Sequence, residues 1–213
     1  MKTDELIAML AAGPTAVDSR AYLRRFATAL GWAAFGGMLL MAIFLGVRPD
    51  LAQAASVPMF WVKLGFGIVL AAAGVIAAAR LGRPGARTGI AGWLVAAPIA
   101  LLWLGAVLVL IQAEPGERMA LVLGQTWREC PWNIALLSVP AFAASFWALR
   151  GLAPTRLRIA GAVAGLLAGS IGATVYALHC PELAAPFLAV WYVLGIALTT
   201  AVGALLGPRL LRW

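Results

Sequence analysis

Six long apolar runs, separated by short groups of basic residues, constrain this sequence more than any other feature. A transmembrane helix needs about 20 mostly apolar residues to cross a hydrocarbon core of roughly 30 Å. The sequence therefore predicts an all-α polytopic membrane protein, with six transmembrane helices in residues 26–213 and a short amino-terminal segment, residues 1–25. The expected spans are Phe26–Gly46, Phe60–Ala79, Gly89–Ile111, Asn133–Leu149, Leu157–Leu178 and Pro186–Leu206.

The composition agrees with a membrane protein and argues against a nucleic-acid-binding protein. Hydrophobic residues make up 63% of the chain and charged residues 11%, whereas soluble proteins average about 45–50% and 25%. The net charge is +8. The basic residues are spread between the apolar runs, however, and a nucleic-acid binder collects them on one polar face. We expect a lipid bilayer around the chain and no direct contact with nucleic acid.

The basic residues also predict the orientation of the chain, because loops rich in Lys and Arg stay in the cytoplasm. Twelve lie on one side of the six spans: Lys2, Arg20, Arg24, Arg25, Arg80, Arg83, Arg87, Arg150, Arg156, Arg158, Arg209 and Arg212. Four lie on the other: Arg48, Lys63, Arg118 and Arg128. Both termini are therefore expected in the cytoplasm, beneath a bacterial inner membrane.

A cleaved signal peptide is the competing interpretation of the first span. Arg24-Arg25 precedes its apolar stretch and Ala52-Gln53-Ala54 follows it. The apolar stretch exceeds the usual core of about 7–15 residues in a signal peptide. The length favours a retained span.

Short motifs at the span ends predict that the six spans form three helical hairpins. Basic turns with proline follow the second, fourth and sixth spans, and Cys130-Pro131 and Cys180-Pro181 precede the fourth and sixth. The fifth span carries a ladder of small residues that allows close helix packing, for which the sixth span offers a matching set. The ladder is Gly161, Gly165 and Gly169, and the matching set is Gly195, Thr199 and Gly203.

Groups that carry chemistry are scarce in the spans. An ionisable residue at membrane depth marks a transporter or pump, and the closest candidate, Lys63, is expected to extend to the outer surface. The sequence shows no paired carboxylates, phosphate-binding loop or Ser/His/Asp arrangement. We expect neither an enzyme nor a bound cofactor, so the function should lie at the two aqueous faces.

The sequence of the amino-terminal segment, residues 1–25, predicts a short amphipathic helix near its start. Thr3 is a candidate N-cap, and Asp4 and Glu5 follow it, where the helix dipole favours negative charge. Apolar side chains share one face, and Gly13-Pro14 ends the helix. The residues of this face are Leu6, Ile7, Met9 and Leu10. Such a helix either docks in a groove of a partner protein or is a frayed terminus.

The chain resembles the NrsF-type membrane anti-sigma factors, which hold an extracytoplasmic-function sigma factor inactive at the inner membrane. The opening Lys-Thr-Asp-x-Leu-Ile-x-x-Leu, the six spans and the two external Cys-Pro pairs carry the resemblance. It implies that Leu6, Ile7 and Leu10 contact the sigma factor, with acidic contacts at Glu5 or Asp4. It also implies that the linker Arg20–Arg25 tethers the segment at the membrane, and that inhibition involves no catalysis.

Cys130 and Cys180 are the second candidate site, because both lie at external ends of spans. An oxidising periplasm permits a disulfide between them. Two thiolates with His179 would alternatively make a soft metal site, and the third interpretation is two unpaired thiols that pack as small hydrophobic groups. The resemblance implies that the cysteines sense metal or oxidative stress and cause release of the sigma factor.

Two other functional classes fit the six spans. A small transporter or channel-like protein would work without residues 1–20 and would need a polar pathway through the bundle. A structural membrane subunit would pack against other helices through Gly161, Gly165 and Gly169.

Overall fold

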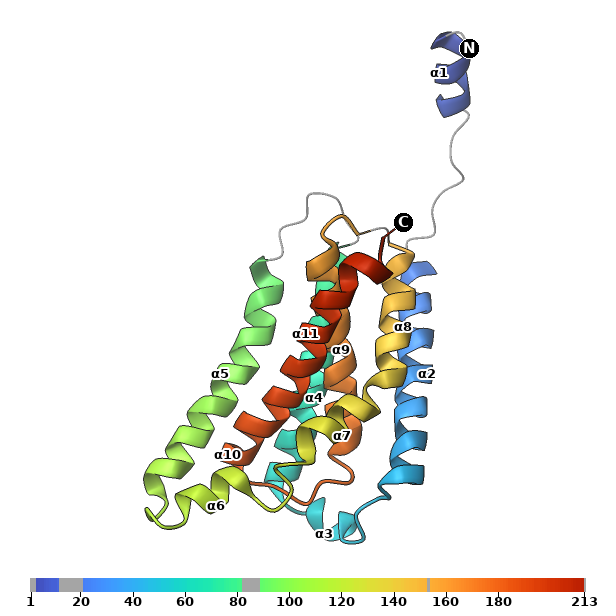
Figure 1. The fold of residues 1–213 in the computed structure, drawn as a ribbon. Helices are drawn as coiled ribbons and strands as arrows, with labels where there is room; N and C mark the ends of the chain where they lie inside the picture. The colour runs from blue at the N-terminus through green and yellow to red at the C-terminus, as the bar shows by residue number, and fades with distance from the viewer. Residues whose placement is uncertain (1–2, 12–20, 82–88, 153, 213) are drawn as a thin grey trace.

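Apolar helices run back and forth through the computed structural model, which describes residues 3–11, 21–81, 89–152 and 154–212 (Figure 1). No strand occurs in these four ranges. The long helices are α2 (Ala21–Phe44), α4 (Pro58–Leu81), α5 (Gly89–Gln112), α9 (Leu157–Tyr176) and α11 (Val193–Leu210). The shorter ones are α1 (Thr3–Ala11), α3 (Leu51–Ala54), α6 (Arg118–Leu123), α7 (Cys130–Leu137), α8 (Val139–Arg150) and α10 (Ala185–Phe187), with a π-helical turn, η1, at Leu188–Tyr192.

The predicted set of six spans is confirmed. Five helical segments are long and apolar enough to cross a membrane, and α7 and α8 together make a sixth if the bent pair is one span. The five are Arg24–Phe44, Pro58–Leu81, Ile90–Gln112, Leu157–Tyr176 and Ala185–Leu210. Their ends lie within a few residues of the predicted ends, because a change in hydropathy marks each boundary in the sequence.

The fourth span is bent by 46° between α7 and α8. Pro140 explains the bend, because proline has no N–H to donate and its ring excludes the carbonyl four residues earlier. At the break the Ser138 Oγ donates to the Ile134 carbonyl at 2.6 Å, and the Phe142 N–H donates to the Ser138 carbonyl at 2.7 Å. The bent span starts at Cys130, three residues before the predicted Asn133.

Helix α9 is the centre of the bundle and α5 its most peripheral helix. The most apolar stretch of α9 is 72% buried inside the protein, and that of α5 only 11%. Helix α9 packs against α2, α4, α7, α8 and α11. A span that touches five other helices needs small side chains, and α9 carries them.

The predicted small-residue contact between the fifth and sixth spans is confirmed. A Cβ atom on Gly161 would meet the Gly203 carbonyl of α11, and a Cβ atom on Gly165 would meet the Thr199 carbonyl. The two backbones therefore touch directly. Gly195 differs from the prediction, since it faces Ile134 of α7 at 3.0 Å and does not face α9.

The three predicted hairpins describe the path of the chain, but only the third is a tightly packed pair of spans. Helix α2 packs mainly against α8, and α4 against α9, so the first two spans do not associate chiefly with each other. The reason is the glycine-rich surface of α9, because small side chains let helices from all parts of the chain pack closely against it.

The two ends of the bundle differ in charge. One end of the bundle, which we call the basic end, holds the start of α2, the ends of α4 and α8, the start of α9 and the end of α11 (Figure 1). Cys130, which begins α7, and Cys180, which follows α9, lie at the other end, which we call the cysteine end. Arg24 and Arg25 belong to helix α2, so the expected linker Arg20–Arg25 is wrong for its last residues. Other predictions concern positions outside the described residues: Lys2, Gly13-Pro14, Arg20, Arg83 and Arg87.

The contact between α9 and α11 generates a stability prediction. A Gly165→Ala substitution places a methyl group against backbone atoms that cannot move aside, and overpacking of this kind costs about 1–3 kcal/mol. We expect the Tm of the purified protein in detergent to fall by roughly 5 °C.

Gly105→Ala is the matched control, because nothing lies within 4 Å of a Cβ atom at that position of α5. Its Tm should stay the same or rise slightly, since alanine favours a helix more than glycine does. Equal effects of the two substitutions would disprove the proposed backbone contact.

Candidate functional site

The predicted amino-terminal helix is present as α1, Thr3–Ala11, with Asp4 and Glu5 in its first turn. Every side chain from residue 3 to residue 9 is exposed. Leu6 is 42% exposed, Ile7 57% and Met9 70%, while the side chain of Leu10 lies outside the described residues. In Figure 1, α1 lies apart from the bundle. A helix of this length is unstable alone in water, and the bundle does not cover the apolar face of α1.

The start of α2 is fastened to the end of α8 by Arg25. Its guanidinium donates from Nη2 to the Trp147 carbonyl at 3.0 Å and lies 4.0 Å from the centre of a ring of the same tryptophan. It also covers Gly151, where a Cβ atom would meet it. Arg25 therefore connects the start of α2, which follows the amino-terminal segment, to the bent span. The sequence did not predict this contact.

Cys130 and Cys180 lie in one buried cluster at the cysteine end. Both are completely buried, both are free thiols, and they share the cluster with Ile134, Tyr176 and Tyr192. The structure thus brings the two predicted residues into one region. Both thiols are unpaired in the structure, and the disulfide stays one of the alternatives that the sequence leaves open.

The alternative metal site, Cys130, His179 and Cys180, does not have its three side chains grouped in this structure. Within the described ranges no three His, Cys, Asp or Glu residues are grouped so that they could hold a metal ion. The His179 ring is engaged elsewhere, because its Nδ1 atom lies 2.8 Å from the Gly46 carbonyl. That contact ties His179 to the loop after α2.

Lys63 does not reach the outer surface, and the prediction for it is wrong. Its side chain is 1% exposed. The Nζ atom donates to the Cys180 carbonyl at 2.8 Å and to the Glu182 carbonyl at 2.9 Å, and lies 5.0 Å from the centre of the Tyr192 ring. The segment after α9 folds over the start of α4 and supplies these acceptors. A buried charge needs such partners, and no local sequence pattern reveals them.

Arg48, in the loop after α2, is a second cation that binds the segment after α9. Its Nη1 atom donates to the Cys180 carbonyl at 3.2 Å, while Nε and Nη2 each donate to a different oxygen of the Asp50 carboxylate at 2.7 Å. This paired contact lowers the pKa of Asp50 and raises the pKa of Arg48. Arg48 is only 8% exposed, so it is a structural part of the cysteine end rather than a loop charge.

Residues 178–182 are therefore held from several sides. Gly46, Arg48 and Lys63 bind them from α4 and the loop after α2, and the Gln125 backbone N–H donates to the Glu182 carboxylate at 2.6 Å. The Cys180 carbonyl accepts two of these hydrogen bonds. These contacts fix the backbone of the segment that carries the Cys180 thiol.

The bent span links the two candidate sites. Helix α7 begins at Cys130 in the buried cluster, and α8 carries Trp147, the contact of Arg25, near its end. Figure 1 shows α7 and α8 running from the cysteine end to the basic end. One continuous element thus touches both the thiol cluster and the start of α2.

The comparisons with known proteins agree on one family. The sequence model of the NrsF family, described as negative regulator of sigma F, matches residues 10–213. The chain is 53% identical to the probable anti-sigma-F factor NrsF of Azospira oryzae over 216 residues, and 40% identical to the anti-sigma-F factor NrsF of Caulobacter vibrioides over 215 residues. Each alignment covers 100% of both chains.

No solved structure matches the chain. The resemblance inferred from the amino-terminal motif, the spans and the Cys-Pro pairs is confirmed by the full-length relatives. This chain belongs to the NrsF family of negative regulators of sigma F.

Proposed function

We propose that this protein is an inner-membrane anti-sigma factor that sequesters an extracytoplasmic-function sigma factor through α1. The observation that carries the proposal is the exposure of every described side chain of α1, including the apolar Leu6, Ile7 and Met9. The relatives' names, anti-sigma-F factors, identify the class of partner. Family membership favours a regulator over an enzyme or transporter.

The orientation of the bundle supports this role. Among the described residues, the basic end holds most of the Lys and Arg side chains, so the positive-inside rule assigns it to the cytoplasm. Helix α1 precedes α2, which starts at that end. The helix would therefore face the compartment that contains RNA polymerase and its sigma factors.

Binding would use the helix-in-groove mode. The apolar face of α1 would enter a hydrophobic groove on the sigma factor, and Asp4 and Glu5 would meet basic residues at its edge. Occupation of that groove would prevent the sigma factor from binding polymerase, with no covalent chemistry. Attachment to the bundle confines the complex to the membrane surface.

Release would begin at the cysteine end. An oxidant or a soft metal ion that reaches Cys130 or Cys180 would add volume or charge to a fully buried cluster. The bent span would transmit the rearrangement to Arg25 through Trp147. A shift at this contact would change the position of α2 and hence the access of α1 to its partner.

The sigma-binding proposal predicts the effect of truncating the apolar face of α1. Burial of one Leu or Ile side chain contributes about 1.5–3 kcal/mol, so a Leu6→Ala/Ile7→Ala variant should bind the cognate sigma factor about a hundredfold more weakly. Co-purification of the sigma factor with the full-length protein from solubilised membranes measures the effect.

Ala8→Gln is the matched control, since Ala8 is exposed on the face of α1 opposite to Leu6. This variant should retain the sigma factor at the level of the natural chain. If the Leu6→Ala/Ile7→Ala variant retains it equally well while inserting normally, α1 does not supply the contact.

The sensing proposal predicts that binding and response can be separated. A Cys130→Ala/Cys180→Ala variant should still capture the sigma factor but should no longer release it when cells meet a thiol-reactive stress, as read by a sigma-dependent reporter. Trp147→Leu leaves both thiols in place but removes the ring contact of Arg25, and it should reduce the response as well. Normal induction in the double cysteine variant would eliminate the thiols as the sensor.

A further inference from the structure

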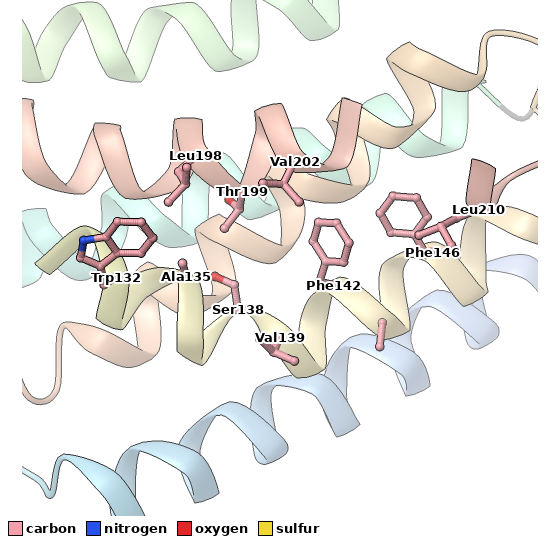
Figure 2. Close-up of a pocket in the computed structure, with 11 residues that line it drawn as sticks. Trp132, Ala135, Ser138, Val139, Phe142, Phe146, Leu198, Thr199, Val202 and Leu210 are labelled. Carbon is pink, nitrogen blue, oxygen red and sulfur yellow. The ribbon is translucent and has the colours of Figure 1, made fainter. Parts of the chain in front are cut away.

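An apolar groove separates the bent span from α11 on the outside of the bundle. Its volume is about 540 Å³. Its origin is the bend at Ser138: α7 packs against α11, whereas α8 turns toward α2 and α9. Figure 2 shows the resulting groove, with side chains from both walls projecting into it. The lining includes Trp132, Phe142, Phe146, Leu198, Val202 and Leu210.

The lining of the groove is mostly hydrocarbon. The rings of Phe142 and Phe146 lie side by side with centroids 4.7 Å apart. Two hydroxyl groups reach the lining, but each is bound to its own helix: Ser138 Oγ donates to the Ile134 carbonyl at 2.6 Å, and Thr199 Oγ1 to the Ile196 carbonyl at 2.9 Å. Neither hydroxyl has a proton left to donate to a ligand, so the groove suits an occupant that is apolar along most of its length.

Two arginines, Arg150 and Arg209, lie close in sequence to the lining residues at the end of the groove nearest the basic end. Arg150 follows the lining residue Phe146 by four positions on α8, so the two share a helix face, and Arg209 adjoins the lining residue Leu210 at the end of α11. Both arginines are exposed. Neither forms an ion pair with any residue in the described part of the chain. Basic residues between transmembrane helices on the cytoplasmic side are typical of sites for anionic lipid headgroups.

We propose that this groove binds one acyl chain of an anionic phospholipid, whose phosphate group contacts Arg150 and Arg209. The charge at one end and the apolar length below it match the two parts of such a lipid. A transmembrane helix is a poorer match in size, since about 20 Å of a helix about 10 Å wide occupies roughly 1,600 Å³. The site is separate from α1 and from the thiol cluster.

The test compares two lipids that differ only in the headgroup. Native mass spectrometry of the purified full-length protein would measure binding of phosphatidylglycerol and of phosphatidylcholine with identical acyl chains. We expect phosphatidylglycerol to bind about tenfold more tightly, because each nearby arginine adds attraction for the anionic headgroup. Equal affinities for the two lipids would overturn the proposal.

Two variants separate the headgroup contact from the groove. Arg150→Gln/Arg209→Gln should remove the preference for phosphatidylglycerol, while Arg118→Gln/Arg128→Gln, with the same loss of charge at the cysteine end, should retain it. Ala143→Phe, which fills the groove, should reduce binding of both lipids. Retained preference in the first variant would disprove the headgroup site. Occupation of the groove by a second copy of the chain, seen as a dimer that Ala143→Phe dissociates, would also overturn the proposal.

Discussion

The direct contact between the backbones of α9 and α11 is the interaction on which the rest of the bundle depends. Helices in a membrane gain little from the hydrophobic effect and associate through close packing. Gly161 and Gly165 of α9 allow that approach, since a side chain at either position would meet the α11 backbone. With α11 this close, the other faces of α9 remain open to α2, α4, α7 and α8, and the cysteine end is assembled around the end of α9.

Much of this fold follows from the sequence because it depends on short-range patterns. Hydropathy marks the spans, and the spacing of Gly161, Gly165 and Gly169 marks a close-packed face. The choice of packing partners does not follow, since α2 selects α8 from across the chain. Lys63 illustrates the same limit: its acceptors, the Cys180 and Glu182 carbonyls, lie more than one hundred residues away.

For the candidate sites too, the sequence predicts the local features but not the contacts between distant residues. The sequence predicts the α1 helix and places both cysteines at one end, and the structure agrees on both points. It does not predict that His179 binds the Gly46 carbonyl instead of joining the thiols, or that Arg25 lies on Trp147. These contacts bring together residues 122 and 133 positions apart. The thiol cluster and the exposed helix are consequently linked by a route, α7 and α8, that no local motif indicates.

We propose above all that α1 binds a sigma factor in the cytoplasm while the transmembrane bundle keeps the complex at the membrane. Site-specific photo-crosslinking in intact cells tests this claim most directly, with the crosslinking residue in place of Ile7 of the full-length protein. The account predicts a covalent adduct with the sigma factor, lost under the inducing stress, and none from the same residue in place of the exposed Gly116 at the cysteine end. Absence of the sigma adduct from position 7, or its appearance at position 116, would contradict the account.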